Sequence, residues 1–151
     1  MTVSLLLANI ADSISQMSVS GVTVKDKDEI VADWESLPNV LFPKPDGWIT
    51  NFSMDFKSFL QGTSAAMDVS YTLTYRFLGT AVGDLSTFPV AYSTLVNKLV
   101  LILNAFIALD APYSGRVELV VGSVDIGPKD DPAGNQYHGA DITINITEMQ
   151  N

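Results

Sequence analysis

The stretch from Met67 to Gly79, MDVSYTLTYRFLG, alternates apolar and polar side chains along its whole length. A period of two is typical of a β-strand with one face on the core and the other facing solvent or a neighbour. The apolar face would hold Met67, Val69, Tyr71, Leu73, Tyr75 and Phe77, and the polar face Asp68, Ser70, Thr72, Thr74 and Arg76. This is the clearest strand in the chain, and the other elements can be placed around it.

Downstream of this strand the sequence predicts a helix over about Val90–Leu109. Pro89 suits the first turn of that helix. The segment is apolar over much of its circumference, which is typical of a helix buried between a sheet and a second surface. We assign Leu99 and Leu103, one turn apart, to the buried core.

Two further strands are predicted towards the end of the sequence, over Arg116–Ile126 and within YHGADITINITEMQN, Tyr137–Asn151. The second alternates cleanly, with Ala140, Ile142, Ile144 and Ile146 on one face. An uncovered strand edge exposes unpaired backbone groups, which is hazardous in a monomer. This strand is therefore either an interior strand of its own sheet or a contact with a second subunit, and the sequence leaves both possibilities open.

Upstream lies a segment rich in proline, WESLPNVLFPKPDGW, from Trp34 to Trp48. Three prolines within eight positions prevent a helix and favour extended or turn conformations. Asp46-Gly47 is a strong turn signal. We predict a hairpin with arms at Val40–Phe42 and Trp48–Thr50, placed at a sheet edge because of the prolines.

The first segment, Thr2–Met17, carries apolar residues at helical spacing and predicts an amphipathic helix. The order is then helix, several strands, helix and two strands. We predict one domain over residues 1–151 of the α+β class, with a mainly antiparallel sheet of about five strands and two helices.

The composition narrows the classes of function. The 151 residues are 47% hydrophobic, and 17 acidic residues against 8 basic ones give a net charge of -9. Such a surface disfavours tight nucleic-acid binding but permits DNA to slide past. The absence of cysteine excludes disulfides, thiolate catalysis and cysteine-ligated metals. We expect neither a signal peptide nor a membrane span, and a cytosolic protein.

The residues whose side chains could take part in catalysis form no recognisable catalytic set. His138, the single histidine, lies beside Asp141 without a triad-like motif, and we expect it in a surface loop. Asp130, Asp131 and Asn135 lack the ligand spacing of a calcium loop and are typical of turns. No phosphate-binding loop is present. We therefore expect no enzyme activity, no cofactor and no metal.

The opening helix Thr2–Met17, the buried helix Val90–Leu109 and the closing HGADITINITEMQN together resemble the tail terminator (tail completion) proteins of long-tailed bacteriophages. The resemblance implies a hexameric ring that caps the tail tube, stops its polymerisation and presents a surface to the head. It implies as partners further copies of the chain, the tail-tube protein and a head-neck connector protein. DNA would pass through the ring without specific binding. The protein would lie in the virion tail, assembled in the host cytoplasm.

Two segments are the candidate partner contacts. They comprise Pro43, Lys44, Asp46, Gly47, Trp48, Asp130, Asp131, Asn135, Tyr137 and His138. We expect the proline-stiffened hairpin to reach out of the ring and dock on the tail tube, with Trp48 as an exposed anchor. The alternative is an ordinary surface hairpin with Trp48 folded back onto the core.

Two other functions remain open. Another neck or tail-tube component of a phage would have the same composition. A hotdog-like ligand-binding protein or enzyme would instead line an acyl pocket with the Val90–Leu109 helix, near His138 or Asp141, but the sequence offers no convergent polar set for it.

Overall fold

The computed structural model describes residues 7–25, 39–58, 65–82, 88–109, 117–132 and 134–150. The elements in these ranges are α1 (Leu7–Ser15), β1 (Thr23–Val24), β2 (Val40–Pro43), β3 (Ile49–Ser58), β4 (Ala65–Ala81), α2 (Phe88–Ala108), β5 (Val117–Asp130) and β6 (Gln136–Gln150). The predicted α+β class is confirmed, with six strands in a mainly antiparallel sheet. Residues 2–6 of the predicted first helix lie outside the described residues.

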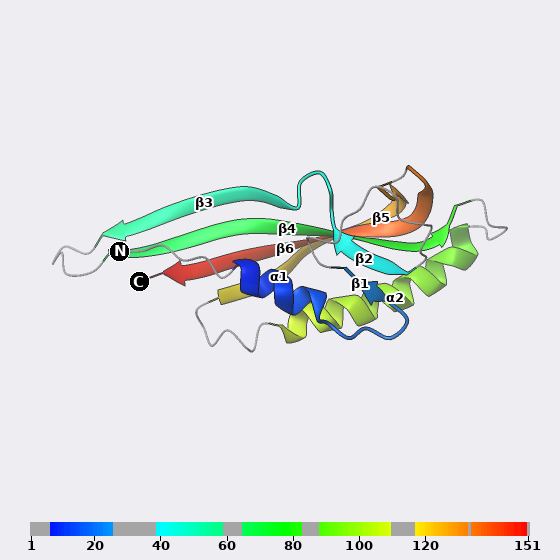
Figure 1. The fold of residues 1–151 in the computed structure, drawn as a ribbon, viewed down its shortest axis with the longest axis horizontal. Coiled ribbons are helices and arrows are strands. Elements are labelled where there is room, and N and C mark those ends of the chain that lie inside the picture. Colours follow the sequence, from blue (N-terminus) through cyan, green and yellow to red (C-terminus); the bar gives the residue numbers. More distant parts are fainter. Residues whose placement is uncertain are drawn as a thin grey trace.

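The sheet is built around β4, which has 17 residues. The strand order is β1-β2-β4-β6-β5, and β3 pairs with the part of β4 that β2 leaves open (Figure 1). β1 and β2 are parallel and the other pairs antiparallel. The last strand, β6, therefore lies in the interior of its own sheet, between β4 and β5. Of the two possibilities for the closing strand, coverage by its own chain is the correct one.

The predicted hairpin between β2 and β3 is wrong. Both strands pair with β4 in the same direction, end to end along one edge. Between them, residues 44–48 form a loop that Thr74 of β4 closes. Its carbonyl accepts from the amide of Lys44 at 3.0 Å, and its own amide donates to the carbonyl of Trp48 at 2.8 Å. Gly47 has a φ of 95°, so the predicted turn exists, but it joins two in-line strands because β4 is long enough to pair with both.

The main core lies between the sheet and both described helices, which cover the same face (Figure 1). The helices contribute the buried residues Ile10, Ile14, Leu95, Leu99, Ile102 and Phe106. The predicted apolar face of β4 meets them, with the Phe106 ring centroid 5.8 Å from that of Tyr75. Leu99 is confirmed as core, whereas Leu103 is only partly buried.

The helix α2 is buried on one face rather than nearly all round. Tyr92, Val100, Leu101 and Ile107 are 44–62% exposed. The expected second surface is not supplied by the described part of the chain, because the sheet covers only one side of the helix. By length and composition alone, Ala91–Ala108 would suffice to cross a membrane. A core helix packed on a sheet satisfies the same criterion.

Candidate partner-contact surface

The face of the sheet opposite the described helices, here called the outer face, is polar along its middle. Side-chain oxygens of neighbouring strands approach each other at 3.4, 3.0 and 2.7 Å in the pairs Ser70–Thr147, Thr72–Asn145 and Ser123–Thr143. A bulge at Gly122 leaves room for this array, since a β-carbon there would lie 2.7 Å from the Asn145 amide nitrogen. Hydroxyl and amide groups therefore satisfy one another across three strands without carrying charge.

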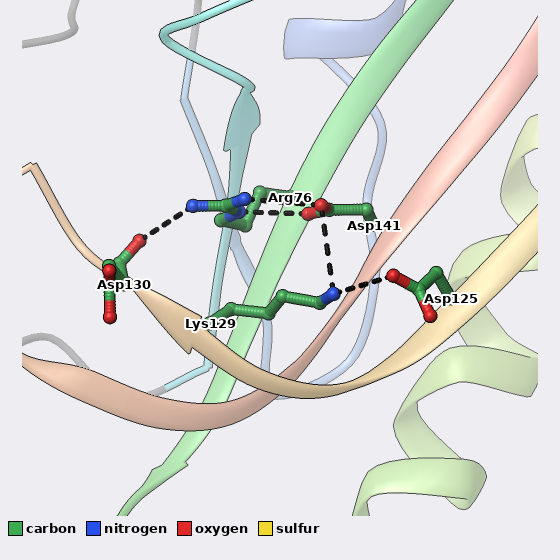
Figure 2. Close-up of polar contacts among 5 residues, drawn as sticks. All are labelled: Arg76, Asp125, Lys129, Asp130 and Asp141. Carbon is green, nitrogen blue, oxygen red and sulfur yellow. Dashed lines mark hydrogen bonds and ion pairs between the residues drawn. The ribbon is translucent and has the colours of Figure 1, made fainter.

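A network of ionised side chains lies at one end of this array (Figure 2). The guanidinium of Arg76 donates to both carboxylate oxygens of Asp141, at 2.8 and 3.1 Å, and to the backbone carbonyl of Asp130 at 3.0 Å. The ammonium of Lys129 lies 2.8 Å from Asp125 and 3.8 Å from Asp141. Both cations are thus paired with carboxylates, and the Arg76–Asp141 pair is bidentate, which is the stronger type.

These contacts shift the pKa of two groups in the network. The hydrogen bond with Asp141 raises the pKa of Arg76. The hydrogen bond with Lys129 lowers the pKa of Asp125. Because the pKa of Asp125 is lowered in the folded chain, the Asp125–Lys129 pair stabilises the fold at pH values above the usual carboxylate range. This stabilisation is lost as the pH falls through the lowered pKa.

A hollow of about 350 Å³ opens beside this network, between the 44–48 loop and the turn that joins β5 to β6. It is lined by Lys44, Pro45, Asp46, Arg76, Asp130, Asp131, Pro132 and Gly134. The fold therefore brings the two predicted contact segments to one place, although they lie far apart in the sequence. Lys44, Asp46, Asp130 and Asp131 are the predicted residues that line it.

Of the other predicted contact residues, two support turns around this hollow. Gly47 supplies the left-handed turn of the 44–48 loop. Asn135 donates from its backbone amide and its side-chain amide to the carboxylate of Asp131, at 2.8 and 3.2 Å. The prediction that Asp131 and Asn135 stabilise a turn is therefore confirmed.

Besides Asp131, which is 7% exposed, three predicted contact residues are buried and one is partly buried. Pro43 is buried within β2, and Trp48 is partly buried against the main core. The alternative of a tryptophan folded back onto the core is thus the correct one, because its large apolar ring gains more from burial than from solvent. Tyr137 is 1% exposed in a small cluster on the outer face with Val40, Phe42 and Leu78. His138 is buried within β6 rather than in a surface loop.

Two features escaped the sequence reasoning. The Arg76–Asp141 pair spans 65 residues, and no local signal links its members. The exposed side of α2 could have been found from its spacing, since Tyr92, Val96 and Val100 recur at every fourth position.

In the described ranges no group of three or more acidic or histidine side chains could hold a metal ion.

No protein-family model matches this chain, and no curated protein matches it significantly. The functional argument therefore depends on the geometry of the outer face, the hollow and the edges of the sheet.

Replacing Asp141 with asparagine is expected to lower the free energy of unfolding by about 2 kcal/mol. The side chains of Arg76 and Lys129 are only 17% and 12% exposed, so both cations would lose a charged partner where water replaces it poorly. Urea denaturation followed by circular dichroism measures the change. Asp125→Asn is the control: its side chain is 76% exposed, so water screens its pairing with Lys129 and we expect no measurable change in the denaturation midpoint. Equal effects of the two substitutions would contradict this description of the network.

Proposed function

We propose that this chain is the tail terminator of a long-tailed bacteriophage. It forms a ring that caps the tail tube, stops tube polymerisation and offers a surface to the head-neck connector. The ring encloses a channel for DNA, lies in the virion tail and is assembled in the host cytoplasm. The protein acts through contacts and not through catalysis.

The observation that carries this proposal is the chemistry of the outer face. Its middle is a neutral array of hydroxyl and amide groups. Arg76 and Lys129 lie beside that array, each within 3 Å of a carboxylate oxygen. Phosphate groups are held chiefly by cations whose charge is available, and a chain with a net charge of -9 repels them at long range. A duplex could pass such a face without adhering, which suits the wall of a channel.

The hollow is the proposed dock for the tail-tube protein. The 44–48 loop interrupts the pairing along the edge of β4, and Pro45, Asp46 and Gly47 in this loop are exposed. Lys44 and Asp46 place opposite charges at the rim. Such rim charges contribute mainly to the specificity and rate of association. Trp48 does not contact the partner in this proposal; it packs against the core and so holds the 44–48 loop in place.

A charge exchange at the rim tests this assignment. Lys44→Glu combined with Asp46→Lys keeps the net charge and leaves Trp48 in place. We expect a folded ring with an unchanged Tm that no longer caps tails, so that electron microscopy of lysates shows overlong tails. Ser93→Glu with Asn97→Lys is the matched control, because both positions are exposed on the polar side of α2.

Tails of uniform length in the rim variant would show that the hollow is not the dock. Tails of uniform length after deletion of the whole chain would refute the terminator function itself.

A further inference from the structure

The hollow beside the ionised network has an excess of negative charge. Its charged lining consists of three carboxylates and two cations: Asp46, Asp130, Asp131, Lys44 and Arg76. One of these cations is already neutralised, because the guanidinium of Arg76 binds both oxygens of Asp141. Lys44 is thus the one lining cation left to balance three carboxylates. A group that enters the hollow therefore meets a field that favours positive charge.

Two of the lining carboxylates are available to such a group. Asp131 is held by the backbone and side-chain amides of Asn135. Asp130 accepts from Arg76 through its backbone carbonyl and not through its carboxylate (Figure 2). In the described part of the chain, neither Asp46 nor Asp130 has an ion-pair partner for its carboxylate.

The carboxylates of Asp46 and Asp130 lie close to the same guanidinium, although they belong to different segments. The pKa of Arg76 is raised chiefly by its hydrogen bond to Asp141, and the charges of Asp130 and Asp46 raise it further. One comes from the 44–48 loop and the other from the end of β5. A single bound cation could therefore contact both sides of the hollow.

The lining suits an organic cation better than a metal ion. A divalent cation needs several oxygen ligands that converge at about 2.0–2.6 Å. In the described ranges no group of three or more acidic or histidine side chains meets that requirement. Pro45 and Pro132 also line the hollow, and their rings offer apolar surface. A cation on an aliphatic stem can use both the carboxylates and the prolines.

We infer that the hollow receives an arginine side chain of the tail-tube protein, whose guanidinium bridges Asp46 and Asp130. A guanidinium is planar and presents five N–H donors, so it can bind carboxylates on two sides at once. The ammonium of lysine is a compact point charge and bridges less well. The volume of about 350 Å³ is at the lower end of the range for ligand pockets, about 300–1,000 Å³. It therefore has room for a side chain and not for a helix.

This inference rests on the proposed function and names the group that the dock recognises. The chain itself is a poor source of that group, because it has 8 basic residues against 17 acidic ones. Arg76 and Lys129 are paired with carboxylates, and Lys98 donates to the backbone carbonyl of Ser20 at 3.3 Å. A partner that carries basic side chains would also be attracted by the net charge of -9, which speeds association.

Titration with blocked amino acids tests the inference on the purified chain. The probes are N-acetyl-arginine methylamide and the corresponding lysine and glutamate derivatives, and NMR follows the backbone amides. We expect the arginine derivative to shift the amides of Asp46, Asp131 and Gly134 in a saturable way. The lysine derivative should bind more weakly and the glutamate derivative not at all. Added salt should weaken the arginine binding, because it screens the carboxylates.

A double variant shows whether the two carboxylates are responsible. Asp46→Asn combined with Asp130→Asn keeps the shape of both side chains and should weaken arginine binding by at least about tenfold. The control combines Asp12→Asn with Asp55→Asn, which removes the same charge. Both of these positions are exposed and neither lines the hollow, so arginine binding should be unchanged.

Amides that do not shift with the arginine derivative, or equal binding by the Asp46→Asn, Asp130→Asn variant, would overturn the inference. Shifts with the glutamate derivative instead would assign the hollow to an acidic partner that binds Lys44. Shifts with calcium chloride but not with the arginine derivative would assign it to a metal ion. Both results count against the inference.

The phage separates the inference from the proposed function. The Asp46→Asn, Asp130→Asn variant should fold with an unchanged Tm and give overlong tails. Tails of uniform length with this variant would overturn the inference alone, provided that deletion of the chain still gives overlong tails. Uniform tails after the deletion would refute the terminator function, whereas arginine binding by the purified chain would not be affected.

Discussion

Gly139→Ala is expected to lower the free energy of unfolding by roughly 3 kcal/mol, because a β-carbon at this position would clash with the backbone carbonyl of Phe77. Gly139 lies opposite Leu78 where β4 and β6, the two central strands, pair. A backbone atom cannot move aside as a flexible side chain can. The substitution must therefore separate the two strands or shift their register, and either change disturbs the whole sheet.

The control for this prediction is a glycine on the neighbouring strand β5. Gly127 of β5 pairs with Gly139, yet a β-carbon at position 127 would meet no atom of the described residues within 4 Å. Gly127→Ala should therefore change the stability by less than about 0.5 kcal/mol. Urea denaturation curves of both variants measure the difference. Comparable midpoints for the two would show that β4 and β6 do not approach as closely as described.

Phe106→Ala is expected to cost about 3–5 kcal/mol, as for other fully buried phenylalanines. Phe106 is 0% exposed and packs on Tyr75, so truncation leaves a cavity between α2 and the middle of β4. The nearby sheet cannot collapse into this space, because its strands are fixed by hydrogen bonds on both sides. Leu99→Ala should behave similarly, at about 2–5 kcal/mol.

The neighbouring Ile107 provides the contrast. It lies next to Phe106 in α2 but is 62% exposed, so Ile107→Ala should change the free energy of unfolding of a single chain by less than about 1 kcal/mol. The comparison requires dilute protein, at concentrations where the denaturation midpoint does not depend on concentration. A large loss for Ile107→Ala and a small one for Phe106→Ala would mean that the orientation of α2 is wrong.

The local parts of the fold could be predicted from the sequence, because local spacing determines them. The alternation through Met67–Phe77 predicted the face of β4 that meets the core, and the apolar run predicted α2 to within two residues at its start and one at its end. The pairing of strands is not local. The turn at Gly47 was predicted, but whether its flanking strands pair with each other or with β4 depends on a partner that lies much further along the chain.

The same distinction applies to the candidate site. The sequence identified Lys44, Asp46 and Asp130, but it could not show that they line one hollow, because tertiary folding brings them together. It also left open whether Trp48 is an exposed anchor or folds back onto the core, since the pattern near the prolines gives no indication of which way the ring turns. The apolar circumference of α2 was read as burial on all sides. In the described part of the chain, the exposure of Tyr92, Val100, Leu101 and Ile107 shows that such a pattern also fits a helix that is buried on one face.

Native mass spectrometry of the purified chain tests the central claim, self-association into a ring, most directly. We predict one discrete oligomer, of six copies, that persists over a range of protein concentrations and at high ionic strength, where repulsion between acidic chains is screened. A chain that remains monomeric under all these conditions would contradict the account.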